Sequence, residues 1–116
     1  MSDLTQKHCE SCEGIGQALT SAQITNLLPQ LDNAWQVESK TKLIRQFKFN
    51  NFYETMSFAN AIAWIANIEN HHPDLKLGYN YCHVHLTTHA LEGLTMNDFI
   101  CAAKIDQLLL DNHQSH

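Results

Sequence analysis

Apolar residues recur at helical spacing in three parts of the chain, and each part has a recognisable boundary. Residues 20–23 read Thr-Ser-Ala-Gln, the pattern of a capping box, and Pro29 is expected to end the helix that they start. A longer helix is predicted from residue 52 and must stop near residues 70–73, because proline disfavours the α conformation in the residue before it. The last helix follows residues 95–98, which resemble another N-terminal cap. The apolar positions of the three helices are Ile24, Leu27, Leu28 and Leu31; Phe52, Met56, Phe58, Ala59, Ile62, Ala63, Ile65 and Ala66; and Phe99, Ile100, Ala103, Leu108 and Leu110.

Between these helices, apolar and polar residues alternate in a way that predicts two β-hairpins. In the first hairpin, Trp35 and Val37 precede a turn at residues 39–41, and the returning strand carries Leu43, Arg45, Phe47 and Phe49 on one side. In the second, a turn at residues 80–81 joins Leu75, Leu77 and Tyr79 to Cys82, Val84, Leu86 and Thr88. The predicted order is α-β-β-α-β-β-α. It defines an α+β fold in which helices pack on one face of a four-stranded antiparallel sheet.

The chain length of 116 residues fits a single domain with its own hydrophobic core. Residues 1–18 are polar, include two glycines and show no periodicity, so we expect a loosely packed N-terminal arm before one domain over residues 19–116. The N-terminus lacks the apolar segment of a signal peptide, and no apolar run is long enough to cross a bilayer. These features favour a cytoplasmic protein.

The charge balance restricts the class of partner. The formal charge is −5, and the apolar fraction of 44% is that of an ordinary globular protein. Nucleic acids and anionic lipid headgroups both require basic surfaces, so neither is expected as a partner. A neutral or weakly polar small molecule is the natural alternative. The four cysteines are scattered, and we expect free thiols at Cys9, Cys12, Cys82 and Cys101.

Histidines provide the candidate chemistry, because five of the eight fall between residues 71 and 89. Their unperturbed pKa of about 6.5 suits proton transfer near neutral pH. Adjacent side chains point in different directions, so His71 and His72 are placed to flank a small planar substrate, and Pro73 holds His72 in an extended conformation. The alternative for these residues is a polar loop that follows a helix.

A second candidate site lies at the end of the last predicted strand, where Thr87, Thr88 and His89 precede a helix start. Strand ends held by rigid elements are common places for binding groups. Asp98 falls in the first turn of the following helix, where the helix dipole favours a negative charge. A role in capping alone is equally compatible with the position of Asp98.

A series of blocks between Trp35 and Asp106 carries a family pattern with its spacing intact. The blocks are Leu43-x-Arg45-x-Phe47-x-Phe49-x-x-Phe52, a helix with Phe58 and Asn60, His71-His72-Pro73, Tyr79-Asn80, Val84-x-Leu86-x-Thr88-His89, Gly93-Leu94-Thr95 and Asp98. Together they resemble the pterin-4a-carbinolamine dehydratase family. The arm, with His8-Cys9-x-x-Cys12, is similar to that of bacterial members.

This resemblance implies a hydro-lyase that converts 4a-hydroxytetrahydropterin to quinonoid dihydropterin and water. Such an enzyme recycles the cofactor of aromatic amino acid hydroxylases, which implies a functional link to such a hydroxylase. The resemblance also implies a homodimer or homotetramer. It assigns catalysis to His71, His72 and His89, and pterin binding to the same histidines with Pro73, Thr88, Ala90, Leu91 and Asp98.

The chemistry that the resemblance implies fits these residues. The hydroxide that leaves C4a must be protonated and N5 must lose a proton, which are general acid–base tasks. Histidines perform such tasks without a metal or another cofactor. We expect His71 and His72 to be the principal acid–base pair, and His89 either to bind and polarise the ring or to assist them.

Two positions depart from the family pattern. The family usually has a glutamate four residues before the first histidine, where this chain has Asn67, and often an arginine just before the aspartate, where this chain has Asn97. Glu69 is a candidate to replace the missing carboxylate. Substrate affinity, rather than the type of reaction, is what these changes affect.

Three other interpretations compete with this one. Strict alternation places His83, His85 and His89 on one strand face, which is a plausible three-histidine zinc site, although a solvated sheet face explains His83 and His85 as well. The Cys9-x-x-Cys12 pair suits zinc shared with a partner chain, or redox chemistry, only weakly. A binding module is the third, since some animal relatives serve as dimerisation cofactors of a homeodomain transcription factor.

Apolar residues on both sides of the last helix favour self-association, namely Phe99, Leu108, Leu109 and Leu110.

Overall fold

The computed structural model describes residues 3–114, with side chains described for residues 4–109. A 3-10 turn, η1 (Asp3–Gln6), and a short helix, α1 (Cys12–Ile15), come first. The remaining elements are α2 (Ser21–Leu27), η2 (Leu28–Gln30), β1 (Gln36–Glu38), β2 (Lys42–Lys48), α3 (Phe52–Glu69), β3 (Asp74–Leu77), β4 (Tyr81–Leu86), η3 (His89–Leu91) and α4 (Met96–Gln114). From α2 onward, the α-helices and strands follow the predicted order α-β-β-α-β-β-α.

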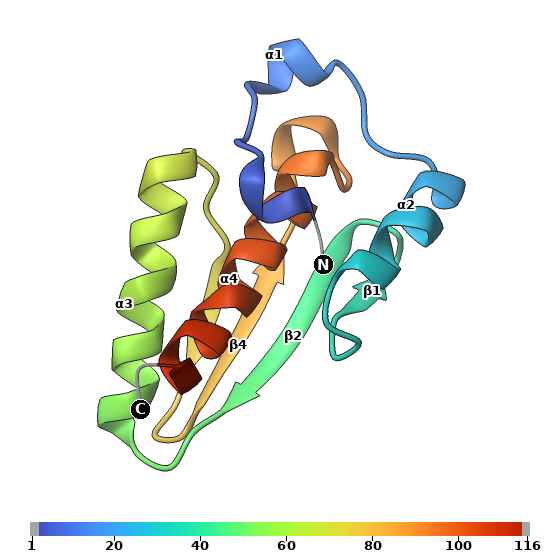
Figure 1. Ribbon diagram of the computed structural model, residues 1–116. Coiled ribbons are helices and arrows are strands. Elements are labelled where there is room, and N and C mark those ends of the chain that lie inside the picture. The colour runs from blue at the N-terminus through green and yellow to red at the C-terminus, as the bar shows by residue number, and fades with distance from the viewer. Residues whose placement is uncertain (1–2, 115–116) are drawn as a thin grey trace.

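The four strands form one antiparallel sheet in the order β1-β2-β4-β3. The two hairpins meet through β2 and β4, which pair from Leu43 opposite Leu86 to Lys48 opposite Tyr81. The shorter strands β1 and β3 form the two edges (Figure 1). The predicted α+β class with a four-stranded antiparallel sheet is therefore confirmed.

Helices α3 and α4 cover one face of this sheet (Figure 1). Along β4, Cys82, Val84 and Leu86 are fully buried, whereas His83 and His85 between them are half-buried. Side chains alternate across a strand, so the buried set faces the helices and the two histidines face the other side. The strand pattern thus sets which face of the sheet carries the core.

A charged residue on the apolar side of β2 is accommodated by an ion pair. The Nη1 atom of Arg45 lies 2.6 Å from Oδ1 of Asp106 on α4, and the guanidinium lies 4.3 Å from the centre of the Phe47 ring. The indole Nε1 of Trp35 donates to the same carboxylate at 2.8 Å. Burial raises the pKa of Asp106, although the hydrogen bond from Trp35 and the charge of Arg45 act to lower it. These contacts explain how Arg45 occupies the predicted apolar side.

Helix α3 is flanked by two asparagines, Asn51 at the N-cap and Asn70 at the C-cap. The Oδ1 atom of Asn51 accepts from the amide of Glu54 at 2.9 Å, and Asn70 at the C-cap is left-handed, with φ 52°. The amides of Asn70 and His71 both donate to the carbonyl of Ala66. Asparagine tolerates this conformation better than most residues, so the helix ends within the predicted range and the chain leaves it at His71.

The apolar stripe of α3 differs in part from the prediction. Phe52 is 50% exposed and Ala63 is exposed, whereas Thr55 and Glu69 are buried. Thr55 donates to the carbonyls of Asn51 and Tyr79, each at 3.0 Å, which compensates for burying its hydroxyl. The helix therefore buries polar groups that a purely apolar stripe does not predict.

The turn of the second hairpin also differs from the prediction. Strand β3 ends at Leu77, and the chain reverses over residues 78–80 rather than at residues 80–81. The amide of Gly78 donates to the carbonyl of Tyr81 at 3.0 Å, and a Cβ atom at Gly78 would collide with the Tyr81 ring. The glycine permits this close approach, which leaves Tyr79 exposed in the turn.

Residues 4–10 of the N-terminal arm are packed against the domain, so the prediction of a loose arm is wrong for this part of it. Leu4 is 1% exposed and belongs to the hydrophobic core, and η1 lies against α4 (Figure 1). Helix α4 is consequently covered by η1 as well as by the sheet and α3. The polar composition of the arm gave no indication that Leu4 packs into the core.

Because α4 is covered by η1, the sheet and α3, the prediction that Phe99 belongs to an exposed apolar surface is wrong. Phe99 is fully buried, Leu108 and Leu109 are half-buried, and the side chain of Leu110 lies outside the described residues. Exposed apolar side chains lie on or near α3 and β3 instead. They are Phe52, Tyr53, Trp64, Ile68, Leu75, Leu77 and Tyr79.

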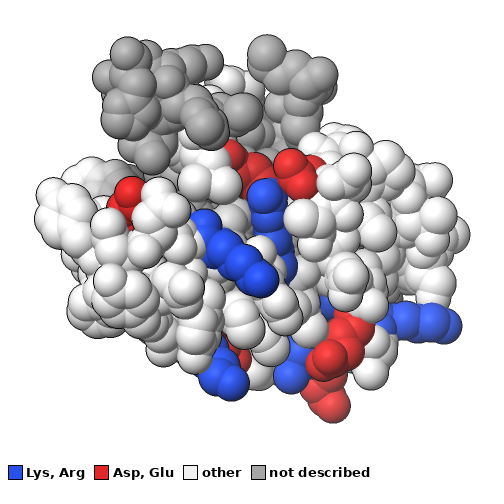
Figure 2. Space-filling view, turned by 90° about the horizontal axis from the view of Figure 1, so that it is seen from below, with Lys and Arg blue, Asp and Glu red and all other residues white. Residues whose placement is uncertain are grey.

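Charges on the lower face of the molecule are mixed. Figure 2 shows Lys and Arg interspersed with Asp and Glu there, so this face has no continuous basic stripe of the kind that nucleic acids require. Among the described residues, no helix combines the length and apolar character needed to cross a membrane.

Candidate active site

The candidate site is built around a hydrogen bond between the side chains of His71 and Asp98. The Nε2 atom of His71 lies 2.6 Å from Oδ1 of Asp98, whose side chain is fully buried, and the histidine side chain is 11% exposed. His71 follows the end of α3, and Asp98 lies in the first turn of α4. Two separate elements therefore place an imidazole against a carboxylate that has no access to solvent.

The other oxygen of Asp98 stabilises the start of α4. Oδ2 accepts from the Thr95 amide at 2.9 Å and from the Thr88 hydroxyl at 2.8 Å. The Thr95 hydroxyl in turn accepts from the Asn97 amide at 3.2 Å, which completes a reciprocal cap. The sequence leaves two roles open for Asp98, capping of the helix alone or support of the histidine site. In the structure, Asp98 both caps α4 and contacts His71. Its charge is also favoured by the positive end of the α4 dipole.

Thr88 fixes the end of β4, where the predicted alternation stops. Strand β4 ends at Leu86, and Thr88 then forms an isolated bridge with Gly93. The chain turns into η3 at His89, so the prediction that His89 continues the strand face of His83 and His85 is wrong. His89 and Ala90 are exposed, and Leu91 is half-buried.

His72 is exposed, and it lines a small cavity next to Pro73. This cavity has a volume of about 150 Å³, and α3 contributes Asn67 to it, together with Ile62, Ala63 and Ala66. Asn67 is one of the two departures from the family pattern, and it therefore faces the same space as His72. Leu75 of β3 completes the lining.

The structure brings some of the predicted residues into direct contact and leaves others apart. Hydrogen bonds join His71, Asp98 and Thr88. Within residues 4–109, the rings of His72 and His89 form no hydrogen bond to another side chain. Both are next in sequence to a member of the bonded set, His72 to His71 and His89 to Thr88, and both residues are exposed.

Glu69 does not replace the missing carboxylate at the site, so that prediction is wrong. Its Oε1 accepts from the Cys9 amide at 2.8 Å, and its Oε2 lies 3.0 Å from Nδ1 of His8 and 3.1 Å from Nζ of Lys104. Burial acts to raise the pKa of Glu69, but these three partners outweigh it and lower the pKa to about 2. The carboxylate is turned toward the arm and is ionised there.

The four cysteines are free thiols. Burial raises the pKa of Cys82 to about 11, and the neighbouring thiol of Cys9 together with burial raises the pKa of Cys101. Such thiols are poor nucleophiles near neutral pH. No three His, Cys, Asp or Glu side chains within the described part of the chain are grouped so that they hold a metal ion. The three-histidine alternative and the Cys9-x-x-Cys12 alternative therefore gain no support.

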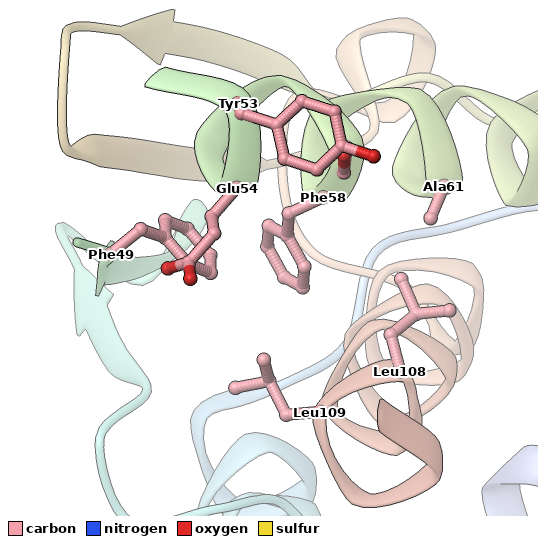
Figure 3. A pocket seen from close by; sticks show the side chains of 8 residues that line it. Phe49, Tyr53, Glu54, Phe58, Ala61, Leu108 and Leu109 are labelled. Atoms are coloured by element: carbon pink, nitrogen blue, oxygen red, sulfur yellow. The ribbon is translucent and has the colours of Figure 1, made fainter. Parts of the chain in front are cut away.

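Two larger cavities lie away from the histidines. One, of about 490 Å³, separates the first half of α3 from the end of α4, and Figure 3 shows Phe49, Phe58 and Leu108 among its walls. The other, of about 650 Å³, lies beside Ile24 and Trp35. Tyr53 and Glu54 are the titratable residues in the first cavity, and the Glu54 carboxylate accepts from the Asn50 amide at 3.0 Å. No histidine lines either cavity, so the histidines next to Asp98 and Thr88 are the better candidates for proton transfer near neutral pH.

Comparison with known proteins identifies the family of this chain. The family model described as "Pterin 4 alpha carbinolamine dehydratase" matches residues 17–108. The chain is 73% identical over 111 residues to "Putative pterin-4-alpha-carbinolamine dehydratase" of Legionella pneumophila (strain Lens), covering 95% of this chain and 98% of that protein. It is 49% identical over 108 residues to a protein of the same name from Nitrosomonas eutropha, covering 93% of this chain and 95% of that protein. The chain therefore belongs to the pterin-4a-carbinolamine dehydratase family, as its motifs predicted.

Solved structures agree with the fold. A transcriptional coactivator/pterin dehydratase from Brucella melitensis is similar with a TM-score of 0.74 and 32% identity, over 79% of this chain and 98% of that chain. A pterin dehydratase-like protein, identified as a RuBisCO assembly factor in the alpha-carboxysome, is similar with a TM-score of 0.56 and 25% identity. The latter match covers 65% of this chain and 88% of that chain.

Proposed function

We propose that this protein dehydrates 4a-hydroxytetrahydropterin to quinonoid dihydropterin and water by histidine acid–base catalysis. The observation that carries the proposal is the 2.6 Å contact between His71 and the fully buried Asp98, at the position of the family's histidine motif. Buried carboxylates that orient a histidine are a recurrent device for proton transfer. Family membership supplies the class of substrate.

The hydrogen bond to Asp98 determines which atom of His71 is available for chemistry. With Nε2–H donated to the carboxylate, the lone pair lies on Nδ1, and this assignment follows from the partner rather than from an observed hydrogen. In the proposed mechanism, Nδ1 of His71 exchanges a proton with the pterin. Asp98 stabilises the imidazolium that forms when His71 accepts that proton.

His72 is the second member of the proposed acid–base pair. The C4a–O bond breaks as the departing hydroxide takes a proton and leaves as water, while N5 loses its proton, so the reaction is balanced without a cofactor. Each transfer is worth roughly 10²–10⁴-fold in rate. His89 binds and polarises the ring, and Pro73, Thr88, Ala90 and Leu91 complete the proposed pterin-binding set.

The biological setting belongs to the same proposal. The enzyme recycles the cofactor of an aromatic amino acid hydroxylase in the cytoplasm and acts as a homodimer or homotetramer. Exposed Trp64 and Ile68 on α3, and exposed Leu75 and Leu77 on the edge strand β3, support self-association.

A coupled assay tests the function directly. An aromatic amino acid hydroxylase generates the 4a-carbinolamine, and its absorbance is followed with and without this protein. Acceleration of its decay supports the proposal, and an unchanged decay contradicts it. The assay is repeated with EDTA, because a loss of activity that zinc restores would transfer the chemistry to a metal site.

A further inference from the structure

The N-terminal arm makes its polar contacts at the ends of the two helices that carry the His71–Asp98 pair. On the α3 side, the last residue of the helix, Glu69, binds the arm through the Cys9 amide at 2.8 Å and the His8 ring at 3.0 Å. Glu69 is 7% exposed and ionised. His71 follows two residues later, so this contact fixes the segment from which its imidazole projects.

On the α4 side, the contact is made by Asn97, the residue before Asp98. The Glu10 amide donates to Oδ1 of Asn97 at 2.9 Å, and Nδ2 of Asn97 donates to the Glu10 carbonyl at 2.8 Å. The side chain thus satisfies both backbone groups of one arm residue, which requires a donor and an acceptor in a single planar group. Asn97 is 3% exposed. An arginine at this position has no acceptor and could not make this pair of bonds.

A third contact lies between these two. The Sγ atom of Cys9 lies 3.7 Å from Sγ of Cys101 and 3.6 Å from the carbonyl of Asn97, and Sγ of Cys101 lies 4.0 Å from the carbonyl of His71. Leu4, buried in the core, holds the beginning of the arm on α4. The arm therefore bridges the two helix ends at several points rather than resting on one of them.

We propose that residues 4–10 position His71 against Asp98 by tying the end of α3 to the start of α4, with Glu69 and Asn97 as positioning residues. The inference rests on the proposed function, and it gives the arm a role that the sequence did not predict. His71 and Asp98 belong to different elements, and misplacement of a reacting group by 1 Å can lower a rate by roughly 10²-fold. Loss of the bridge should therefore lower kcat more than it raises KM.

The central variant is Asn97→Ala, which removes both hydrogen bonds to Glu10 and leaves Asp98 in place. We expect kcat to fall by about tenfold and KM to change by less than about threefold. Thr55→Ala is the matched control, because it removes a buried hydroxyl and its hydrogen bonds at the opposite end of α3. Ser11→Ala, which removes a cap of α1 within the arm, is the second control. A similar fall of kcat in Thr55→Ala would overturn the proposal.

A double-mutant cycle separates positioning from general stability. If Asn97 acts through the His71–Asp98 pair, Asn97→Ala should lower kcat by less than about twofold in an Asp98→Asn background. If Asn97→Ala lowered kcat by the same factor in the wild-type and Asp98→Asn backgrounds, the arm would act independently of the His71–Asp98 pair. That result would contradict the proposal. Circular dichroism establishes that each variant is folded before kinetics are compared.

A second measurement does not depend on catalysis. The Nε2–H of His71, held against a buried carboxylate, should give a slowly exchanging imidazole signal in a ¹⁵N-edited NMR spectrum, assigned by its loss in His71→Ala. We expect this signal to broaden in Asn97→Ala and to persist in Thr55→Ala and Ser11→Ala. Its persistence in Asn97→Ala would refute the positioning role. A wild-type protein without dehydratase activity would refute the proposed function instead, and the NMR result would still decide the role of the arm.

Discussion

Asp98 divides its two carboxylate oxygens between the fold and the candidate site, because Oδ1 lies 2.6 Å from Nε2 of His71 while Oδ2 caps α4. The same buried side chain thus fixes the start of a helix and the orientation of an imidazole. This coupling means that the two roles must be separated by substitutions that preserve one of them.

The substitution Asp98→Asn separates these roles. An amide oxygen still accepts from the Thr95 amide, so the cap persists, but the neutral side chain no longer stabilises a charged His71. We expect kcat to fall by roughly 10²-fold or more, with circular dichroism unchanged. Asp98→Ala should add a loss of stability of about 1–3 kcal/mol, because Thr88 and Thr95 lose their acceptor in a buried site. An Asp98→Asn protein with normal turnover would contradict the role of the pair.

The sequence predicts those parts of the structure that local signals encode. The Thr20–Gln23 capping box forms as predicted, with both reciprocal hydrogen bonds present. Pro29 ends α2 in a 3-10 turn, and Pro73 follows the end of α3. Caps, prolines and alternation act within a few residues, which is why these elements could be derived without any long-range information.

Contacts between distant segments could not be derived in this way. Glu69 meets Cys9 across 60 positions, and Asn97 meets Glu10 across 87. A polar residue near a helix end gives no sign of its partner, so Glu69 was assigned to the wrong site. The sequence signal at Asn97 was its departure from the arginine that the family resemblance often implies there. The structure gives this departure a physical reason, because the Asn97 amide binds the backbone of Glu10.

His89 shows a different limit, in which a correct local rule stops applying. Alternation predicts the faces of β4 up to Leu86, where the strand ends. The bridge between Thr88 and Gly93 then turns the chain into η3, and this depends on a glycine five residues ahead. Periodicity contains no information on where a strand ends, so the position of His89 required the structure.

Self-association gives a prediction that concerns α3. Trp64 is 70% exposed and Ile68 is 57% exposed, and they lie one helical turn apart. We expect light scattering on wild-type protein to give twice or four times the mass of one chain. The double variant Trp64→Glu/Ile68→Glu should shift the mass downward, because it places charge in a buried contact. Gln107→Glu, an exposed change on α4, is the control, and an unaltered mass in the double variant would assign the interface to another surface.

The acid sensitivity of the arm follows from Glu69. Its pKa in the folded protein is about 2, below the ordinary value of 4.5, so the folded state favours the ionised form. The stabilisation is complete above pH 4.5 and is lost as the pH falls toward 2, and it amounts to about 3 kcal/mol at most. We expect Glu69→Gln to lower the free energy of urea unfolding at pH 7. The difference in unfolding free energy between this variant and the wild type should become smaller below pH 4.5. A difference that stays constant down to pH 2.5 would show that Glu69 is not held by these contacts.

The final prediction compares His72, which is proposed to take part in catalysis, with His83, which is not. His72 is exposed beside the small cavity next to Pro73, whereas the His83 ring lies against Tyr81, with 4.8 Å between the ring centres, on the sheet face away from the helices. Neither side chain belongs to the hydrophobic core, so both alanine variants should stay folded with the wild-type oligomer.

If His72 moves a proton in the transition state, His72→Ala should lower kcat by roughly 10²-fold or more, with a smaller effect on KM. His83→Ala should leave kcat almost unchanged, because its ring meets no member of the His71–Asp98–Thr88 set. Steady-state kinetics in the coupled assay measure both, after gel filtration has verified the assembly. Equal damage from the two substitutions would mean that the wrong histidines carry the reaction. Unchanged turnover in both would remove His72 from the mechanism and leave His71 with Asp98 as the remaining acid–base group.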